Sequence, residues 1–294
     1  AFSRSAYYSA VAALPLLAAY ELLLVLAGNP RGMQVRSAAD VWLRTLLESL
    51  GAQPSQATWV MMLLVALSIP LARKPGITLE PRYFALMLLE ALAYSVALGV
   101  VINLVLYFLV YSWAQPAGLL PGLTHGLART WAAAVPAGQT PAQAVALSLG
   151  AGLFEEFVFR VVLVNTLLFF SRLLMAPVLA GLVALGTSLP VFLACSVVLP
   201  AVLAGLVAIV AGAAVFVIGY KLLAPWLPAT VAVAGAALLF ALAHYLGPLA
   251  DSFSVHSFLF RALAGLIFTV LYYQRGFAIA AYSHALYDIW VLAF

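Results

Sequence analysis

The stretch APVLAGLVALGTSLPVFLACSVVLPAVLAGLVAIVAGAAVFVIGY, residues 176–220, contains no Asp, Glu, Lys, Arg or His. As one helix it would be roughly 68 Å long, more than twice the hydrocarbon core of a bilayer, which is about 30 Å thick. The stretch therefore predicts two transmembrane helices that fold back on each other. Because proline interrupts a helix, we expect the break near Pro190 or Pro200.

The composition of the whole chain points to the same class. Of its 294 residues, 66% are hydrophobic and only 7% are charged, whereas soluble domains are about 25% charged. Such a chain cannot cover itself with a polar surface, which excludes a soluble globular protein. Its long continuous apolar runs exclude an outer-membrane barrel, whose strands alternate apolar and polar residues. We expect an all-α, polytopic transmembrane bundle.

The apolar runs predict about nine spans, with eight as the alternative. Besides the pair in residues 176–220, we expect spans at about 6–27, 57–72, 83–113, 142–171, 226–246, 253–273 and 277–294. Apolar and charged residues alternate near residues 37–50, which predicts an amphipathic helix at the membrane interface. A Pro- and Gly-rich segment, 115–141, predicts a loop. We expect residues 1–294 to form a single integral membrane domain.

Charged residues outside the apolar runs are scattered. The net charge of +4 is the excess of 13 Lys and Arg residues over 9 Asp and Glu residues. The basic residues are scattered between apolar runs and fit loop anchors better than a nucleic-acid surface. We therefore expect the bilayer, and no nucleic acid, as a partner. Glu21 and Glu90 lie in or near spans, and we expect them to pair with polar groups of the bundle.

One apolar segment carries concentrated charge: Gly150-Ala-Gly-Leu-Phe-Glu155-Glu156-Phe-Val-Phe-Arg160. Each charged side chain inside a membrane costs about 2.5–3.5 kcal/mol on insertion scales, so three together need pairing, hydration or a function. Glu156 and Arg160 stand four residues apart, which favours a salt bridge on one helix face. Glu155 is rotated about 100° away and projects into a different space.

Two histidines lie in later apolar runs. Phe240 and His244 share one helix face, and His284 and Asp288 are again four residues apart and can touch. A carboxylate close to imidazoles in a partly dry cavity is suited to activating a water as general base and to stabilising an oxyanion. These residues are therefore candidate catalytic groups.

The three motifs together resemble a known family. Glu155-Glu156-x-x-x-Arg160, Phe240-x-x-x-His244 and His284-x-x-x-Asp288, in this order, are similar to the signature of the CPBP family of intramembrane endopeptidases, which includes CAAX prenyl proteases and bacteriocin-processing proteins. The resemblance covers about half of the chain, residues 141–294, as a catalytic core. Residues 1–140 carry no assigned motif, and the apolar stretch between the first two motifs is longer than is usual in the family.

The resemblance implies a role for each motif residue. Glu155 would be the general base that deprotonates the attacking water, and His244 would position that water. Glu156 would orient the site through Arg160. The catalytic set is completed by the groups at the oxyanion, His284 and Asp288, and we expect substrate contacts from Phe240 and Tyr287. An ionised Asp cannot donate to an oxyanion, so Asp288 either orients His284 or is protonated.

A metal-dependent variant is the alternative. Glu155, His244 and His284 could ligate zinc. The sequence lacks the His-Glu-x-x-His spacing, and the resemblance implies a glutamate mechanism without metal, so we expect no cofactor.

The function implied by the resemblance is hydrolysis of a peptide bond in a membrane-anchored protein or peptide near the lipid interface. The abundance of Ala, Leu, Val and Gly is typical of a high-GC bacterium, so we expect a processing or C-terminal sorting protease in a bacterial inner membrane. One alternative is a non-proteolytic transporter or immunity protein whose buried charges line a substrate or proton path. A second alternative is a membrane scaffold for a partner complex. In a scaffold, we would expect Glu155, His244 and His284 to lie more than about 10 Å apart.

Overall fold

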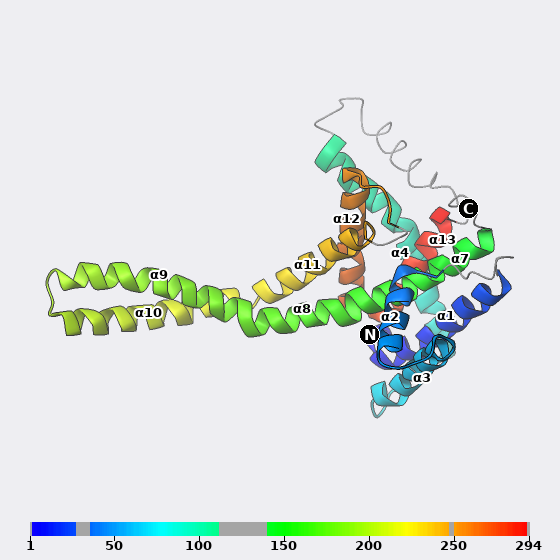
Figure 1. Cartoon of the computed structure of the whole chain (residues 1–294), viewed down its shortest axis with the longest axis horizontal. Coiled ribbons are helices and arrows are strands. Elements are labelled where there is room, and N and C mark those ends of the chain that lie inside the picture. The colour runs from blue at the N-terminus through cyan, green and yellow to red at the C-terminus, as the bar shows by residue number, and fades with distance from the viewer. Residues whose placement is uncertain (1, 28–35, 112–139, 247–249, 293–294) are drawn as a thin grey trace. The chain divides into compact units, whose positions relative to one another are not determined.

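The computed structural model describes residues 2–27, 36–111, 140–246 and 250–292, and within these ranges every element is a helix (Figure 1). The α-helices are α1 (Ala6–Leu26), α2 (Ala38–Ser49), α3 (Pro54–Ala72), α4 (Pro81–Leu106), α7 (Pro141–Gly150), α8 (Asn165–Phe170), α9 (Ala176–Ser196), α10 (Ala201–Leu223), α11 (Leu227–Ala243), α12 (Val255–Arg275) and α13 (Phe277–Leu292). A 3₁₀ turn, η1 (Phe2–Arg4), precedes them, and four segments are π-helical: η2 (Tyr107–Tyr111), η3 (Ala151–Glu155), η4 (Phe157–Val164) and η5 (Ser171–Met175).

The helices confirm an integral, multi-pass membrane protein. In the described residues, six helical runs are long and apolar enough to cross a bilayer, and α11 and α13 are shorter apolar helices. The 56-residue run Pro141–Ser196 counts as one of the six. Most of the predicted loop at 115–141 lies outside the described residues.

The sequence predicted that the span at 142–171 is separate from the one that begins at residue 176, and this prediction is wrong. From Pro141 to Ser196 the chain is helical without a break. The π-helical turn η5 ends at Met175, two residues before Pro177, which stands in the first turn of α9. A proline inside a continuous helix removes one backbone hydrogen bond and crowds the preceding turn, and the wider π turn lies in the turn where that crowding falls.

The predicted fold-back in residues 176–220 is confirmed. α9 ends at Ser196, α10 begins at Ala201 with Pro200 before it, and Pro190 lies inside α9. The two helices lie side by side (Figure 1), and small residues such as Ala180, opposite Gly219, line their contact. Small residues let two backbones approach closely, as in other membrane helix pairs.

Contacts among the helices divide the chain into two compact units. Residues up to Val161 and from Ala237 onward form the first, and Val162–Ala236 form the second. The first unit contains every predicted site residue.

Helix α13 is the centre of the first unit. Its residues take part in three clusters of buried apolar side chains among the described residues. In the first, α13 packs with α1 and η3; in the second, with α4 and α12; and in the third, with α1 and α4. Half of its residues are buried, and many of them are alanines, among them Ala280, Ala281 and Ala285. These small side chains allow close approach from several directions, which positions His284 in the middle of the unit.

The helix predicted near residues 37–50 is confirmed as α2, but its orientation differs from a simple interfacial helix. Asp40 is fully buried, and the side chain of Arg44 is only 11% exposed. The apolar residues Val41, Trp42 and Leu46 are exposed instead. The charged face of α2 turns inward because Glu21 of α1 pairs there with Arg44.

Glu21 and Glu90 pair with polar groups of the bundle, as expected, and the partners are arginines. Glu21 pairs with Arg36 and Arg44, and Glu90 of α4 accepts a hydrogen bond of 2.6 Å from Arg275, at the end of α12. These pairs join different helices of the first unit.

Candidate active site

The segment that carries the two glutamates leaves α-helical geometry. α7 begins at a capping box made by Thr140 and Gln143 and continues directly into η3, and Glu156 lies between η3 and η4. π-Helical turns inside α-helices are rare and occur frequently at functional sites. Here they change the direction in which the adjacent Glu155 and Glu156 side chains project.

Glu156 forms the inner part of the site. Its Oε2 lies 3.1 Å from Arg160 Nε, and both side chains are 0% exposed. Its other oxygen, Oε1, accepts a hydrogen bond of 2.9 Å from Nδ1 of His284. The predicted ion pair is confirmed, and it is also joined to α13.

Aromatic rings surround the buried guanidinium of Arg160. Its central carbon lies 4.6 Å from the ring centre of Phe240, 5.7 Å from that of Phe268 and 6.0 Å from that of Phe159. The ring faces attract the cation where water is absent. The aromatic rings and Glu156 together compensate for burying the charge.

Glu155 faces a different partner, as expected from its position beside Glu156. Its Oε2 lies 3.9 Å from Nε2 of His244. That separation is too long for a hydrogen bond. Oε2 is buried and has no hydrogen-bond partner among the described residues.

The end of α11 orients His244. The helix ends at Ala243, so His244 is the first residue beyond it rather than inside a span. Its Nδ1 lies 2.8 Å from the carbonyl oxygen of Phe240, one of the last-turn carbonyls that lack a helical partner. Because a carbonyl only accepts, Nδ1 carries the proton, and in the neutral ring the lone pair of Nε2 points toward Glu155.

His284 lies between two carboxylates. Nδ1 contacts Glu156, and Nε2 lies 3.5 Å from Oδ2 of Asp288. The first contact is a good hydrogen bond, whereas the second is at the limit for one. The ring also stacks on Phe268 at 4.6 Å between ring centres, so three neighbours determine its orientation.

Exposure separates the site into two layers. The Glu156–Arg160 pair is sealed, and the side chain of His284 is 6% exposed. In contrast, the side chains of Glu155, His244 and Asp288 are 14%, 26% and 22% exposed. This outer layer holds the most exposed side chains of the site.

Phe240 links the histidines. Its ring centre lies 4.9 Å from that of His244 and 5.9 Å from that of His284. Phe240 therefore lies between the two imidazoles, and Glu155 lies beside one of them, His244. Tyr287 is placed differently: it stacks on Phe260 of α12 and packs against Gly99 of α4.

The geometry gives little support to a metal centre. Among the residues that the structure describes, no three His, Cys, Asp or Glu side chains are grouped so that they could hold a metal ion. His284 directs both ring nitrogens at carboxylates, and Glu155 and His244 supply only two ligands.

Sequence reasoning missed two aromatic residues of the site, Phe159 and Phe268. Phe159 stands within the first motif, beside Arg160, but apolar residues there have no pattern that separates them from lipid-facing ones. Phe268 lies in α12, far from every motif in the sequence, and its stacking on His284 depends on how the helices pack.

A cavity of about 400 Å³ lies elsewhere, with an apolar lining from α1, α4 and α13, and none of the predicted site residues line it.

Gly152→Ala is expected to destabilise the fold by about 1–3 kcal/mol, through overpacking. A Cβ at this position would lie 2.6 Å from Cβ and 2.7 Å from the backbone nitrogen of Ala285, next to His284, so α13 would have to move. The measurement is thermal unfolding in detergent. Gly181→Ala in α9 is the control, because its Cβ would meet nothing within 4 Å; equal stability of the two variants would contradict the close approach.

Comparison with known proteins gives one match. Residues 217–290 match the family model Type II CAAX prenyl endopeptidase Rce1-like. The match covers about a quarter of the chain, with the second and third motifs inside it and Glu155, Glu156 and Arg160 before it. It confirms the resemblance to CAAX-type proteases over that stretch. No curated protein and no solved structure matches the chain.

Proposed function

We propose that this protein is an intramembrane endopeptidase that uses Glu155 to activate a water for hydrolysis of a peptide bond. The observation that carries the proposal is the outer pair: Glu155 Oε2 and His244 Nε2 lie 3.9 Å apart in side chains that are 14% and 26% exposed, while the neighbouring Glu156–Arg160 pair is sealed. The match to a CAAX endopeptidase family supports peptide hydrolysis as the reaction.

In the proposed reaction, one water contacts both Glu155 and His244, since a separation near 4 Å suits a bridging molecule. Glu155 takes a proton as the water oxygen attacks the peptide carbonyl, and the carbonyl oxygen becomes an oxyanion. His244 accepts a hydrogen bond at Nε2 and so holds the water. Glu155 then returns the proton to the leaving amine, so protons balance over the cycle.

His284 stabilises the oxyanion in this proposal. Glu156 holds Nδ1 firmly, whereas the contact of Nε2 with Asp288 is long. A protonated Nε2 can therefore donate to a substrate oxygen that takes the place of Asp288. Asp288 orients the ring when no substrate is bound. Phe240 contributes the apolar wall beside both imidazoles, and Tyr287 acts through packing of α13.

The substrate that we propose is a membrane-anchored protein or peptide, cut close to the lipid interface, in a processing or C-terminal sorting role in a bacterial inner membrane. An apolar anchor brings the substrate to the bilayer plane, where the exposed apolar faces of the helices meet lipid. The proposed mechanism needs no metal.

The test uses the purified full chain in liposomes and two kinds of quenched-fluorescent reporter. Both kinds carry the same library of peptide sequences at the site to be cut. One carries a C-terminal prenylated cysteine, and the other is fused to a single apolar transmembrane segment. We expect cleavage of the transmembrane reporter, with the cut site identified by mass spectrometry. Cleavage of the prenylated peptide alone would replace the sorting role by prenyl-protein processing, and cleavage of neither would contradict the protease and favour the transporter alternative.

Metal dependence is tested on the same reporter. Prolonged treatment with a zinc chelator is expected to leave the rate unchanged within about twofold, because Glu155 itself supplies the base. Loss of activity that zinc restores would establish the metalloprotease alternative instead.

A further inference from the structure

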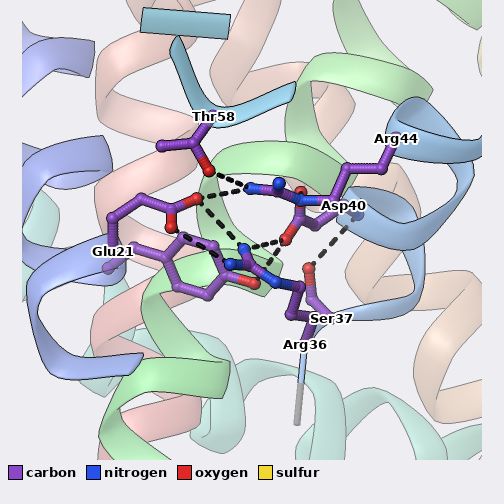
Figure 2. Close-up of polar contacts among 7 residues, drawn as sticks. Glu21, Arg36, Ser37, Asp40, Arg44 and Thr58 are labelled. Atoms are coloured by element: carbon purple, nitrogen blue, oxygen red, sulfur yellow. Dashed lines mark hydrogen bonds and ion pairs between the residues drawn. The ribbon is translucent and has the colours of Figure 1, made fainter. Parts of the chain in front are cut away.

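A buried ionic network fastens α2 to the rest of the first unit. Figure 2 shows Glu21, Arg36, Asp40 and Arg44 pointing toward one another. Arg36 lies 3.1 Å from Glu21 and 2.9 Å from Asp40, and Arg44 lies 2.6 Å from Glu21 and 2.8 Å from Asp40. Arg44 also donates to Thr58 of α3 at 2.8 Å. Three helices, α1, α2 and α3, therefore meet in one network.

The network is electrically balanced, with two guanidinium groups and two carboxylates. Burial acts to lower the pKa of Arg36, but hydrogen bonds from its guanidinium to Glu21 and Asp40 outweigh that effect and raise the pKa above its ordinary value. The network stays charged, and removing one member would leave another buried charge without compensation. Asp40, which is 0% exposed, is held from both sides by the two arginines.

Asp40 also accepts a hydrogen bond that leads toward the candidate active site. The hydroxyl of Tyr20 in α1 donates to Asp40 Oδ2 at 2.7 Å, and Tyr20 is fully buried. Its ring centre lies 5.4 Å from that of Phe154. A Cβ at Gly150 would lie 2.9 Å from Tyr20 Cζ, so the ring rests directly on the glycine.

Gly150 directly precedes the π-helical segment η3, Ala151–Glu155, and Phe154 lies within it, next to Glu155. The Tyr20 ring therefore packs against the start of this segment and against the residue before Glu155. Because a ring held only by packing can tilt and slide, the hydroxyl anchor at Asp40 fixes its depth and rotation. The segment that it supports has the less common π-helical geometry, which side-chain packing must stabilise.

We propose that Tyr20, anchored by Asp40, is a positioning residue that holds Glu155 in register with His244. The role rests on the proposed function of Glu155. It gives α1 and α2, which carry no motif, a part in the reaction: they support the catalytic segment η3 through Tyr20 and Asp40. Tyr20 touches no reacting atom and acts through η3 alone.

The test compares Tyr20→Phe with Tyr8→Phe. Both tyrosines are fully buried in α1, and both substitutions remove a hydrogen-bonded hydroxyl; that of Tyr8 donates to the carbonyl of Thr78 and accepts from the backbone N–H of Glu80, away from η3. We expect Tyr20→Phe to lower kcat on the transmembrane reporter by about 10- to 100-fold, with KM changed less than about twofold, since a small misplacement of a catalytic group costs this much. Tyr8→Phe is expected to keep kcat within about twofold, with a similar shift in unfolding temperature.

Equal kcat values for Tyr20→Phe and Tyr8→Phe would overturn the proposal, because loss of a buried hydroxyl would then explain both. Gly150→Ala gives a second measurement, since its Cβ would displace the same ring. We expect Gly150→Ala to lower kcat about as much as Tyr20→Phe does. In the double variant of Tyr20→Phe with Gly150→Ala, we expect the loss of activation free energy to be smaller than the sum of the two single losses. Full additivity would contradict the idea that both substitutions act on the same ring. Cleavage retained by Glu155→Gln would refute the proposed function itself. The Tyr20 and Gly150 variants test only the positioning role, so the two failures can be told apart.

Discussion

Glu155→Gln lowers kcat on the transmembrane reporter by about 10²–10⁴-fold, the range expected when a general base is removed. The amide keeps the size of the side chain but cannot take a proton from water. The side chain is 14% exposed and makes no ion pair with an arginine in the described residues, so the fold is retained. The measurement is initial rate against reporter concentration, with unfolding temperature measured on the same preparation.

The matched control is Glu48→Gln, on the exposed side of α2. It makes the same chemical change in the same unit and should leave kcat unchanged. If Glu155→Gln kept activity within about tenfold of the parent chain, Glu155 would not be the base, whatever its distance to His244.

Arg160→Met is the substitution with the largest expected effect on stability. It leaves Glu156 fully buried with His284 as its remaining partner, and removal of one member of a buried ion pair costs about 3–5 kcal/mol. Since proteins of this kind have only about 5–15 kcal/mol of net stability, the loss is a large fraction of the total. Denaturant unfolding in detergent measures it.

Two controls separate the burial effect from the loss of an arginine. Arg82→Met removes an arginine that is 69% exposed and paired with Glu80, and should change stability by less than about 1 kcal/mol. The double variant Glu156→Gln with Arg160→Met removes both charges and should recover part of the lost stability, because the amide still accepts from His284. Equal stability of Arg160→Met and Arg82→Met would contradict the buried pair.

Short-range relations in the chain predicted much of the site correctly. The pairs Glu156–Arg160 and Phe240–His244 form as expected from a spacing of four residues, and the separate directions of the two glutamates are also confirmed. The break before Pro200 was one of two predicted positions. Each of these depends on helix geometry over a few residues, which the sequence contains directly.

Other features required contacts between distant segments. The inward orientation of the α2 charges depends on Glu21 in another helix, and the position of Phe268 depends on the packing of α12 against α13. The unbroken helix through residues 171–175 depends on a π turn, for which no simple residue pattern exists. Hydrophobic periodicity carries no information about which of several apolar faces meet.

The sequence by itself determined the class of this protein, a helical membrane bundle. Its long apolar runs carry very few charged residues, and helices satisfy all their backbone hydrogen bonds within the hydrocarbon core of a bilayer. It also indicated candidate catalytic side chains, since so few polar groups lie within those runs. Only the tertiary structure decided that Glu155 meets His244 at the accessible edge, that Glu156 and Arg160 are sealed with His284, and that Tyr20 supports η3. The reason is physical: apolar helices of similar composition can pack in many ways, and the close approaches at Gly150 and Gly152 select one of them.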